Sequence, residues 1–105
     1  MAAIVELIAA KGLEVVAYQS PAGPITPLDM LYGHRPAIAR GNAFMAHHTA
    51  FTDERLGGLL LAAGFASVNT LRAPSFDLWA IAFREQASPD PTLDLLAAHG
   101  LGFRA

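Results

Sequence analysis

Residues 76–84 read FDLWAIAFR, a run that is apolar on both faces of a β-strand. Alternate side chains of a strand point to opposite faces, so the even-numbered residues from Leu78 onward share one face and the odd-numbered residues from Trp79 share the other. A strand of this kind belongs inside a sheet that helices cover on both sides. A chain of 105 residues has little material for such a sheet. The sequence therefore predicts either the end of something larger or a chain that is completed by association.

The composition points to a protein partner. Hydrophobic residues make up 53% of the chain and charged residues 15%, whereas about 25% is typical for charged residues. No apolar run reaches the roughly 18 residues that a membrane span needs, and residues 1–10 lack the basic start of a signal peptide. We expect a cytoplasmic protein, not bound to membranes, with more apolar surface than one modest core can hide.

Charge and cysteine usage exclude several function classes. The net charge is −2 and the basic residues are scattered, so the sequence predicts no binding to nucleic acid or to anionic lipid. The chain contains no cysteine, which excludes disulfides, thiolate metal sites and cysteine nucleophiles.

The first half predicts a helix, a strand, a loop and a second, broken helix. Residues 2–10 favour a helix that ends at Gly12, and because no capping residue precedes it, we expect this helix to continue from upstream sequence. Residues 13–18 are rich in β-branched side chains and predict a strand. Residues 19–27 contain three prolines and predict a loop, and residues 28–39 predict a helix broken near Gly33 and Pro36.

The second half predicts a helix and a hairpin. Thr52 suits the N-cap of a helix over residues 53–63, and Gly64 followed by Phe65 predicts a Schellman stop. Residues 67–72 and 76–84 then predict an antiparallel pair of strands. Residues 86–91 are typical of a linker, and residues 92–99 predict a short final helix. We therefore divide the chain into a domain over residues 1–86 and a tail over residues 87–105.

These elements predict an α/β fold with one small mixed sheet and a terminal antiparallel hairpin. The helix after residue 18 can return the chain to the same sheet, which leaves the outer edge of strand 13–18 without a neighbour. An unpaired edge of this kind readily pairs with a strand of another chain. We therefore expect a homodimer formed through the 13–18 edge, or pairing with a missing N-terminal half.

The helix, the Ala63-Gly64-Phe65 turn and the hairpin resemble the C-terminal end of class I S-adenosylmethionine-dependent methyltransferases, which have a Rossmann-like fold. In that family a helix ends in such a turn and leads into the sixth strand. The seventh strand then lies antiparallel between the fifth and the sixth. The resemblance covers residues 2–85, and it implies that residues 13–18 are the fifth strand and residues 76–84 the seventh. It also implies a parent fold that transfers a methyl group from S-adenosylmethionine to an acceptor.

The chain departs from this family in the half that binds the cofactor. The family holds S-adenosylmethionine with a glycine-rich turn after its first strand and an acidic residue after its second. The glycines of this chain are isolated, and no Gly-x-Gly follows a predicted strand. We therefore expect no catalytic residues, no cofactor-binding residues and no methyl transfer by this chain alone. The alternative is a self-associating interaction module without enzymatic activity.

The segments PLDMLYGHR, residues 27–35, and FMAH, residues 44–47, resemble the insertion after the fifth strand in a bacterial methyltransferase-like subgroup. There the insertion lies near the substrate, which makes Tyr32, His34, Arg35 and His47 candidate substrate-binding residues. Arg35 could bind a substrate carboxylate or form a salt bridge with Asp29.

The histidines of the same region suit no known metal pattern. His34, His47 and His48 could meet in a loop, but their spacing matches no zinc motif, and we predict no metal site. Ser20 lies in a loop that lacks the strand–turn–helix setting of a hydrolase nucleophile.

Overall fold

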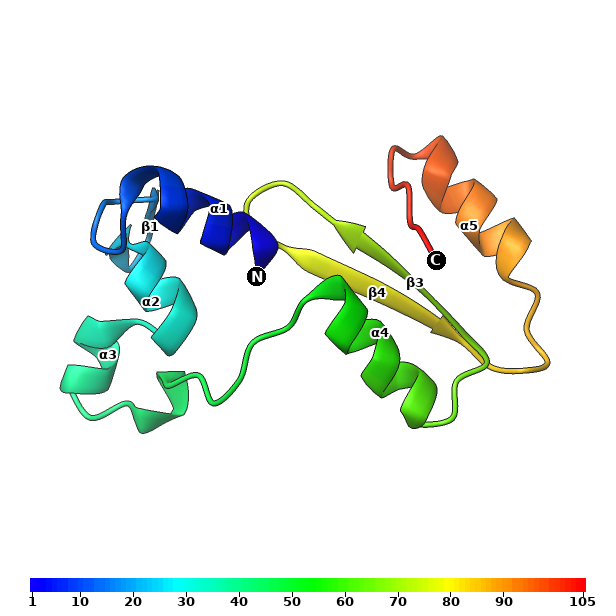
Figure 1. Cartoon of the computed structure of the whole chain (residues 1–105), viewed down its shortest axis with the longest axis horizontal. Coiled ribbons are helices and arrows are strands. Elements are labelled where there is room, and N and C mark those ends of the chain that lie inside the picture. Colours follow the sequence, from blue (N-terminus) through cyan, green and yellow to red (C-terminus); the bar gives the residue numbers. More distant parts are fainter. The chain divides into compact units, whose positions relative to one another are not determined.

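The computed structural model describes all residues from Met1 to Ala105 and divides into two compact units, Met1–Ala50 and Phe51–Ala105 (Figure 1). The protein is a mixed α/β protein with five α-helices and two separate two-stranded antiparallel sheets. The expectation of one mixed sheet is therefore wrong, because no parallel strand pair is formed and each sheet is a local hairpin. None of the helices is both long and apolar enough to cross a membrane.

The first unit contains the helices α1 (Ala2–Lys11), α2 (Pro27–Tyr32) and α3 (Arg35–Ala39), followed by the short 3-10 helix η1 (Ala43–Met45). The predicted first helix is confirmed, and Gly12 ends it with a φ of 93°. The predicted break of the second helix at Gly33 is also confirmed. Gly33 has a φ of 102° and is buried, so a residue with a side chain would be strained there.

The strand of the first unit differs from the prediction. Residues 13–17 form no strand, and the hairpin consists of β1 (Tyr18–Ser20) and β2 (Gly23–Ile25), which lie in the segment predicted as a loop. Gly23 adopts a φ of 110°, and the Ser20 hydroxyl donates a hydrogen bond to the Gly23 carbonyl at 2.9 Å, which supports the tight turn. A proline such as Pro24 is tolerated in a short edge strand where its nitrogen needs no partner.

The second unit begins with α4 (Asp53–Ala62), whose two ends follow the sequence prediction closely. The Thr52 side chain accepts a hydrogen bond from the backbone N–H of Arg55 at 3.1 Å. At the other end Phe65 donates to the Leu60 carbonyl at 3.3 Å and Gly64 donates to the Leu61 carbonyl at 3.0 Å. This pair of bonds is the Schellman motif, and the φ of 105° at Gly64 permits it.

The hairpin of the second unit consists of β3 (Ser67–Arg72) and β4 (Leu78–Phe83), paired antiparallel with Ser67 opposite Phe83. The predicted strand pair is confirmed. However, β4 begins two residues late, because Ser75 and Phe76 have φ values of 64° and 68° and belong to the turn. Helix α4 packs against both strands (Figure 1).

The strand β4 does not lie inside a sheet. It pairs with β3 alone, so the interior position predicted for it is wrong. The physical reason is that its expected second neighbour, residues 13–18, is not a strand that reaches this sheet. The buried hydrophobic residues of the chain are Ile25 in the first unit and Phe83 at the end of β4.

The last helix, α5 (Pro89–Ala98), starts earlier than predicted and takes in part of the predicted linker. Pro89 stands at the start of this helix, where a missing N–H costs nothing because the first turn has no acceptor for it. After α5 the chain returns to β3, where Arg104 forms an isolated antiparallel bridge with Thr70.

Candidate functional site

The candidate substrate-binding residues lie in the first unit, around the junction of α2 and α3. Tyr32 ends α2 and is 64% exposed, whereas His34 is half-buried just before α3. His47 is brought to the same junction by the segment after η1, since its backbone N–H donates to the Tyr32 carbonyl at 3.0 Å. The structure therefore places Tyr32 and His47 side by side along their backbones.

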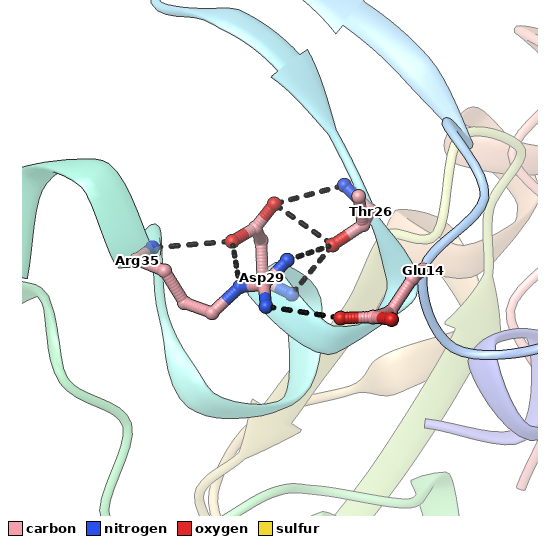
Figure 2. A network of polar contacts seen from close by, with 4 residues as sticks. All are labelled: Glu14, Thr26, Asp29 and Arg35. Atoms are coloured by element: carbon pink, nitrogen blue, oxygen red, sulfur yellow. Dashed lines mark hydrogen bonds and ion pairs between the residues drawn. The ribbon is translucent and has the colours of Figure 1, made fainter.

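Arg35 is held by an intramolecular network, shown in Figure 2. Its Nε donates to Asp29 Oδ1 at 3.2 Å, and its backbone N–H donates to the same oxygen at 3.1 Å. Its Nη1 lies 3.5 Å from Glu14 Oε1, and its Nη2 lies 3.5 Å from Thr26 Oγ1. The ion pair with Asp29, one of the two roles considered from the sequence, is thus formed.

Asp29 is the centre of this network. Its Oδ2 accepts the Thr26 backbone N–H at 3.0 Å and the Thr26 hydroxyl at 2.9 Å, while the Asp29 N–H donates back to Thr26 Oγ1 at 3.2 Å. This is a capping box that fixes the start of α2. Burial of the carboxyl opposes its ionisation, but the hydrogen bonds from Thr26 and Arg35 outweigh burial and hold the pKa of Asp29 well below its usual range.

This network limits how the Arg35 guanidinium can bind a substrate. A substrate carboxylate would have to bind the part of the guanidinium that Asp29 leaves free, and there it would compete with Glu14. The Arg35 side chain is 45% exposed, so such access is open. Contact of a substrate with Tyr32, His34, Arg35 or His47 stays a prediction.

The capping box was missed from the sequence, although a signal for it exists. Thr26 and Asp29 have the spacing of a capping box, with the acidic residue three positions after the threonine. Pro27 at the first helical position is a second signal for the same helix start. Read together, these residues would have marked the buried carboxyl that anchors Arg35.

Of the histidines of this region, His47 contacts the backbone of α2. His47 Nδ1 lies 3.0 Å from the Met30 carbonyl, and because a carbonyl only accepts, this nitrogen must carry the proton. In the neutral ring the other nitrogen is then an acceptor. No three His, Asp or Glu side chains are grouped to hold a metal ion. The Ser20 hydroxyl donates to Gly23 and accepts from the Ala22 N–H at 3.2 Å, which is a turn-stabilising role.

The second unit offers a different kind of site, the two edges of its hairpin. The outer edge of β3 is occupied at Thr70, because the Thr70 N–H donates to the Arg104 carbonyl at 2.6 Å and the Arg104 N–H donates back to the Thr70 carbonyl at 2.8 Å. The backbone groups of Thr70 therefore point away from β4. By the alternation of antiparallel strands, the backbone of Asn69 points toward β4 and meets Ile81, the residue opposite it.

The same alternation fixes the outer edge of β4. Odd-numbered residues of β4 bond to β3, and in agreement with this the carbonyl of Asp77, just before β4, accepts from the Ala73 N–H at 2.9 Å. The N–H and C=O groups of Leu78, Ala80 and Ala82 point to the opposite side. No hydrogen bond of the second unit engages these groups. The outer edge of β4 is hence open along its length, whereas that of β3 is bridged at Thr70.

The open edge also carries apolar side chains. Trp79 is 53% exposed, although it lies between half-buried neighbours on β4. Proteins commonly protect an exposed edge with a charge, a proline or a bulge, and β4 has none of these between Leu78 and Phe83. The arrangement can accept a further strand.

No protein family, curated protein or solved structure was found to match this chain.

Proposed function

We propose that this chain is a non-catalytic association module whose second unit contributes the open edge of β4 to a sheet that another polypeptide completes. The observation that carries this proposal is the contrast between the two edges of the hairpin. The β3 edge is bridged at its middle by Arg104, whereas the β4 edge presents unpaired N–H and C=O groups beside the exposed Trp79.

The resemblance to class I S-adenosylmethionine-dependent methyltransferases supports the same proposal. In that family the strand that corresponds to β4 has neighbours on both sides, so an open outer edge is the expected state of a chain that lacks one neighbour. The helix α4, the Schellman turn at Gly64 and the hairpin follow in the order of that family's C-terminal end. A parent fold of this kind would transfer a methyl group from S-adenosylmethionine to an acceptor.

The residues present do not suit S-adenosylmethionine. The family's cofactor lies against a glycine-rich turn between a parallel strand and a helix, and this chain has no parallel strand pair. Its positive-φ glycines follow helices, or begin β2 in the case of Gly23, and none opens a helix after a strand. We therefore assign the chain no methyl transfer of its own.

Isothermal titration of S-adenosylmethionine, and separately of its demethylated product, into the purified chain tests the non-catalytic part of this proposal. We expect no binding heat from either compound. Saturable binding at micromolar concentration with one site per chain would contradict the proposal, because it would require a cofactor site that the glycine positions do not provide.

A further inference from the structure

We propose that the occupant of the β4 edge is the β4 strand of a second copy of this chain, paired antiparallel about a two-fold axis at Ala80. This inference rests on the proposed function, which assigns association to the same edge, and it adds the partner and the register. The resulting four-stranded sheet would run β3, β4, β4 of the second copy and β3 of the second copy, with the Arg104 bridges on its two outer sides.

The register follows from the backbone groups that point outward. In an antiparallel pair, directly opposite residues exchange two hydrogen bonds only where the backbone groups of both face the partner. The outward residues Leu78, Ala80 and Ala82 are placed symmetrically about Ala80. A two-fold axis at Ala80 sets Ala80 opposite itself and Leu78 opposite Ala82 of the second copy, so that every outward group finds a partner. A shift to another two-fold register leaves outward groups at the strand ends unpaired.

The side chains fit the same register. Between the hydrogen-bonded pairs, Trp79 would lie opposite Ile81 of the second copy, in the closer type of cross-strand pair. The half-exposed indole ring would then be covered by an aliphatic side chain. On the other face the two Ala80 residues meet, and their small side chains leave no steric obstacle.

Charge does not oppose this pairing. The segment Leu78–Phe83 holds no ionisable residue, so strand pairing about Ala80 sets no like charges opposite each other within it. Asp77 stands before the strand and Arg84 after it, and an antiparallel partner brings the Asp77 end of one copy to the Arg84 end of the other. These features favour a second copy over a strand of unrelated sequence.

Disulfide trapping with a single introduced cysteine tests both the partner and the register, because the natural chain has no cysteine. In the Ala80→Cys variant the two thiols belong to a hydrogen-bonded pair with Cα atoms about 5.5 Å apart, within the range a disulfide can span. In the matched Ala82→Cys variant the thiols are four residues apart along the strands, at about 13 Å. We expect Ala80→Cys to form a covalent dimer under mild oxidation about tenfold faster or more than Ala82→Cys, because pairing raises the local thiol concentration.

A second variant tests the edge without a thiol. In Ala80→Pro the lost N–H points away from β3, so the hairpin keeps its internal bonds. Sedimentation analysis should show a dimer for the natural chain and for Ala80→Ser, which keeps the N–H, but a monomer for Ala80→Pro. Circular dichroism must show that the secondary structure of Ala80→Pro is unchanged. A dimer that survives in folded Ala80→Pro would overturn the inference.

The remaining outcomes separate this inference from the proposed function. Equal or faster crosslinking of Ala82→Cys would overturn the Ala80 register, while association through the edge would stand. A natural chain that stays monomeric at all concentrations would overturn the second copy as partner. The non-catalytic assignment fails only if the titration with S-adenosylmethionine gives saturable binding.

Discussion

Asp29 is the one carboxyl group of the chain that is buried, and its residue is only 6% exposed. A buried carboxylate is tolerated when hydrogen bonds and an opposite charge compensate for the lost water. Here the compensation comes from two directions along the chain, from Thr26 before it and from Arg35 after it. One side chain therefore fixes the start of α2 and the start of α3 at once.

This arrangement predicts a specific dependence of stability on pH. Since the pKa of Asp29 is lower in the folded than in the unfolded chain, Asp29 stabilises the fold above the unfolded pKa of about 4, and this contribution is lost as the pH falls toward the folded pKa. Asp29→Asn keeps one amide oxygen, but it removes the negative charge beside Arg35 and one of the two acceptor oxygens, so it should lower the free energy of unfolding by about 1–3 kcal/mol near neutral pH. Urea denaturation near pH 7 and near pH 3 should show a smaller difference between the two proteins at the lower pH.

Glu14→Gln is the matched control for that measurement. Glu14 contacts the same guanidinium at 3.5 Å, but its side chain is 75% exposed. An exposed ion pair contributes little, so this variant should change stability by less than about 0.5 kcal/mol at either pH. A loss for Glu14→Gln as large as that for Asp29→Asn would show that Asp29 is not the anchor of Arg35.

At the scale of helices and strands, the sequence predicts best those features that a few neighbouring residues decide. The ends of α4 depend on Thr52 and Gly64, whose roles follow from local backbone chemistry, and both were predicted. The hairpin β1–β2 was missed because its strands are short and show no hydrophobic alternation. The strand character of residues 78–83 was evident, but whether a second neighbour reaches β4 depends on contacts far along the chain.

Within the candidate site, too, only the contacts between residues close in sequence could be predicted. The pairing of Arg35 with Asp29 was among the roles considered, since the two residues lie close together in sequence. The approach of His47 to Tyr32 depends on how the segment after α3 turns back, which no local pattern encodes. The open edge was expected at residues 13–18, and the structure instead shows it at β4.

The junction between α2 and α3 depends on Gly33. A Cβ at this position would lie 1.9 Å from the carbonyl oxygen of Met45, and the φ of 102° is itself unfavourable for other residues. Gly33→Ala should therefore lower the free energy of unfolding by more than about 2 kcal/mol. The backbone of Met45 would have to move away, and residue 33 would still have to adopt a φ that alanine disfavours. Gly41→Ala is the control, since Gly41 has a φ of 100° but no atom near its Cβ position. Denaturant titration should show a clearly smaller loss for Gly41→Ala, and equal losses would contradict the close approach of Met45.

At the scale of the whole molecule, apolar composition and burial do not match. Hydrophobic residues form 53% of the chain, yet its buried hydrophobic residues are Ile25 and Phe83, and Leu59, Leu61 and Trp79 of the second unit stay about half exposed. Burial of apolar surface is the main favourable contribution to folding. A chain with this imbalance gains further stability when a partner covers its apolar side chains.

This gain predicts that thermal stability depends on protein concentration. Because a dimer forms only from folded chains, mass action should raise the Tm of the natural chain over a hundredfold increase in concentration, by several degrees for a chain of this size. Ala80→Pro should show the same Tm at every concentration, since its edge lacks the central N–H. Calorimetric scans of both proteins across that concentration range measure the effect. A Tm of the natural chain that does not change with concentration would mean that folding is not coupled to association, and that the exposed Trp79 of β4 remains uncovered.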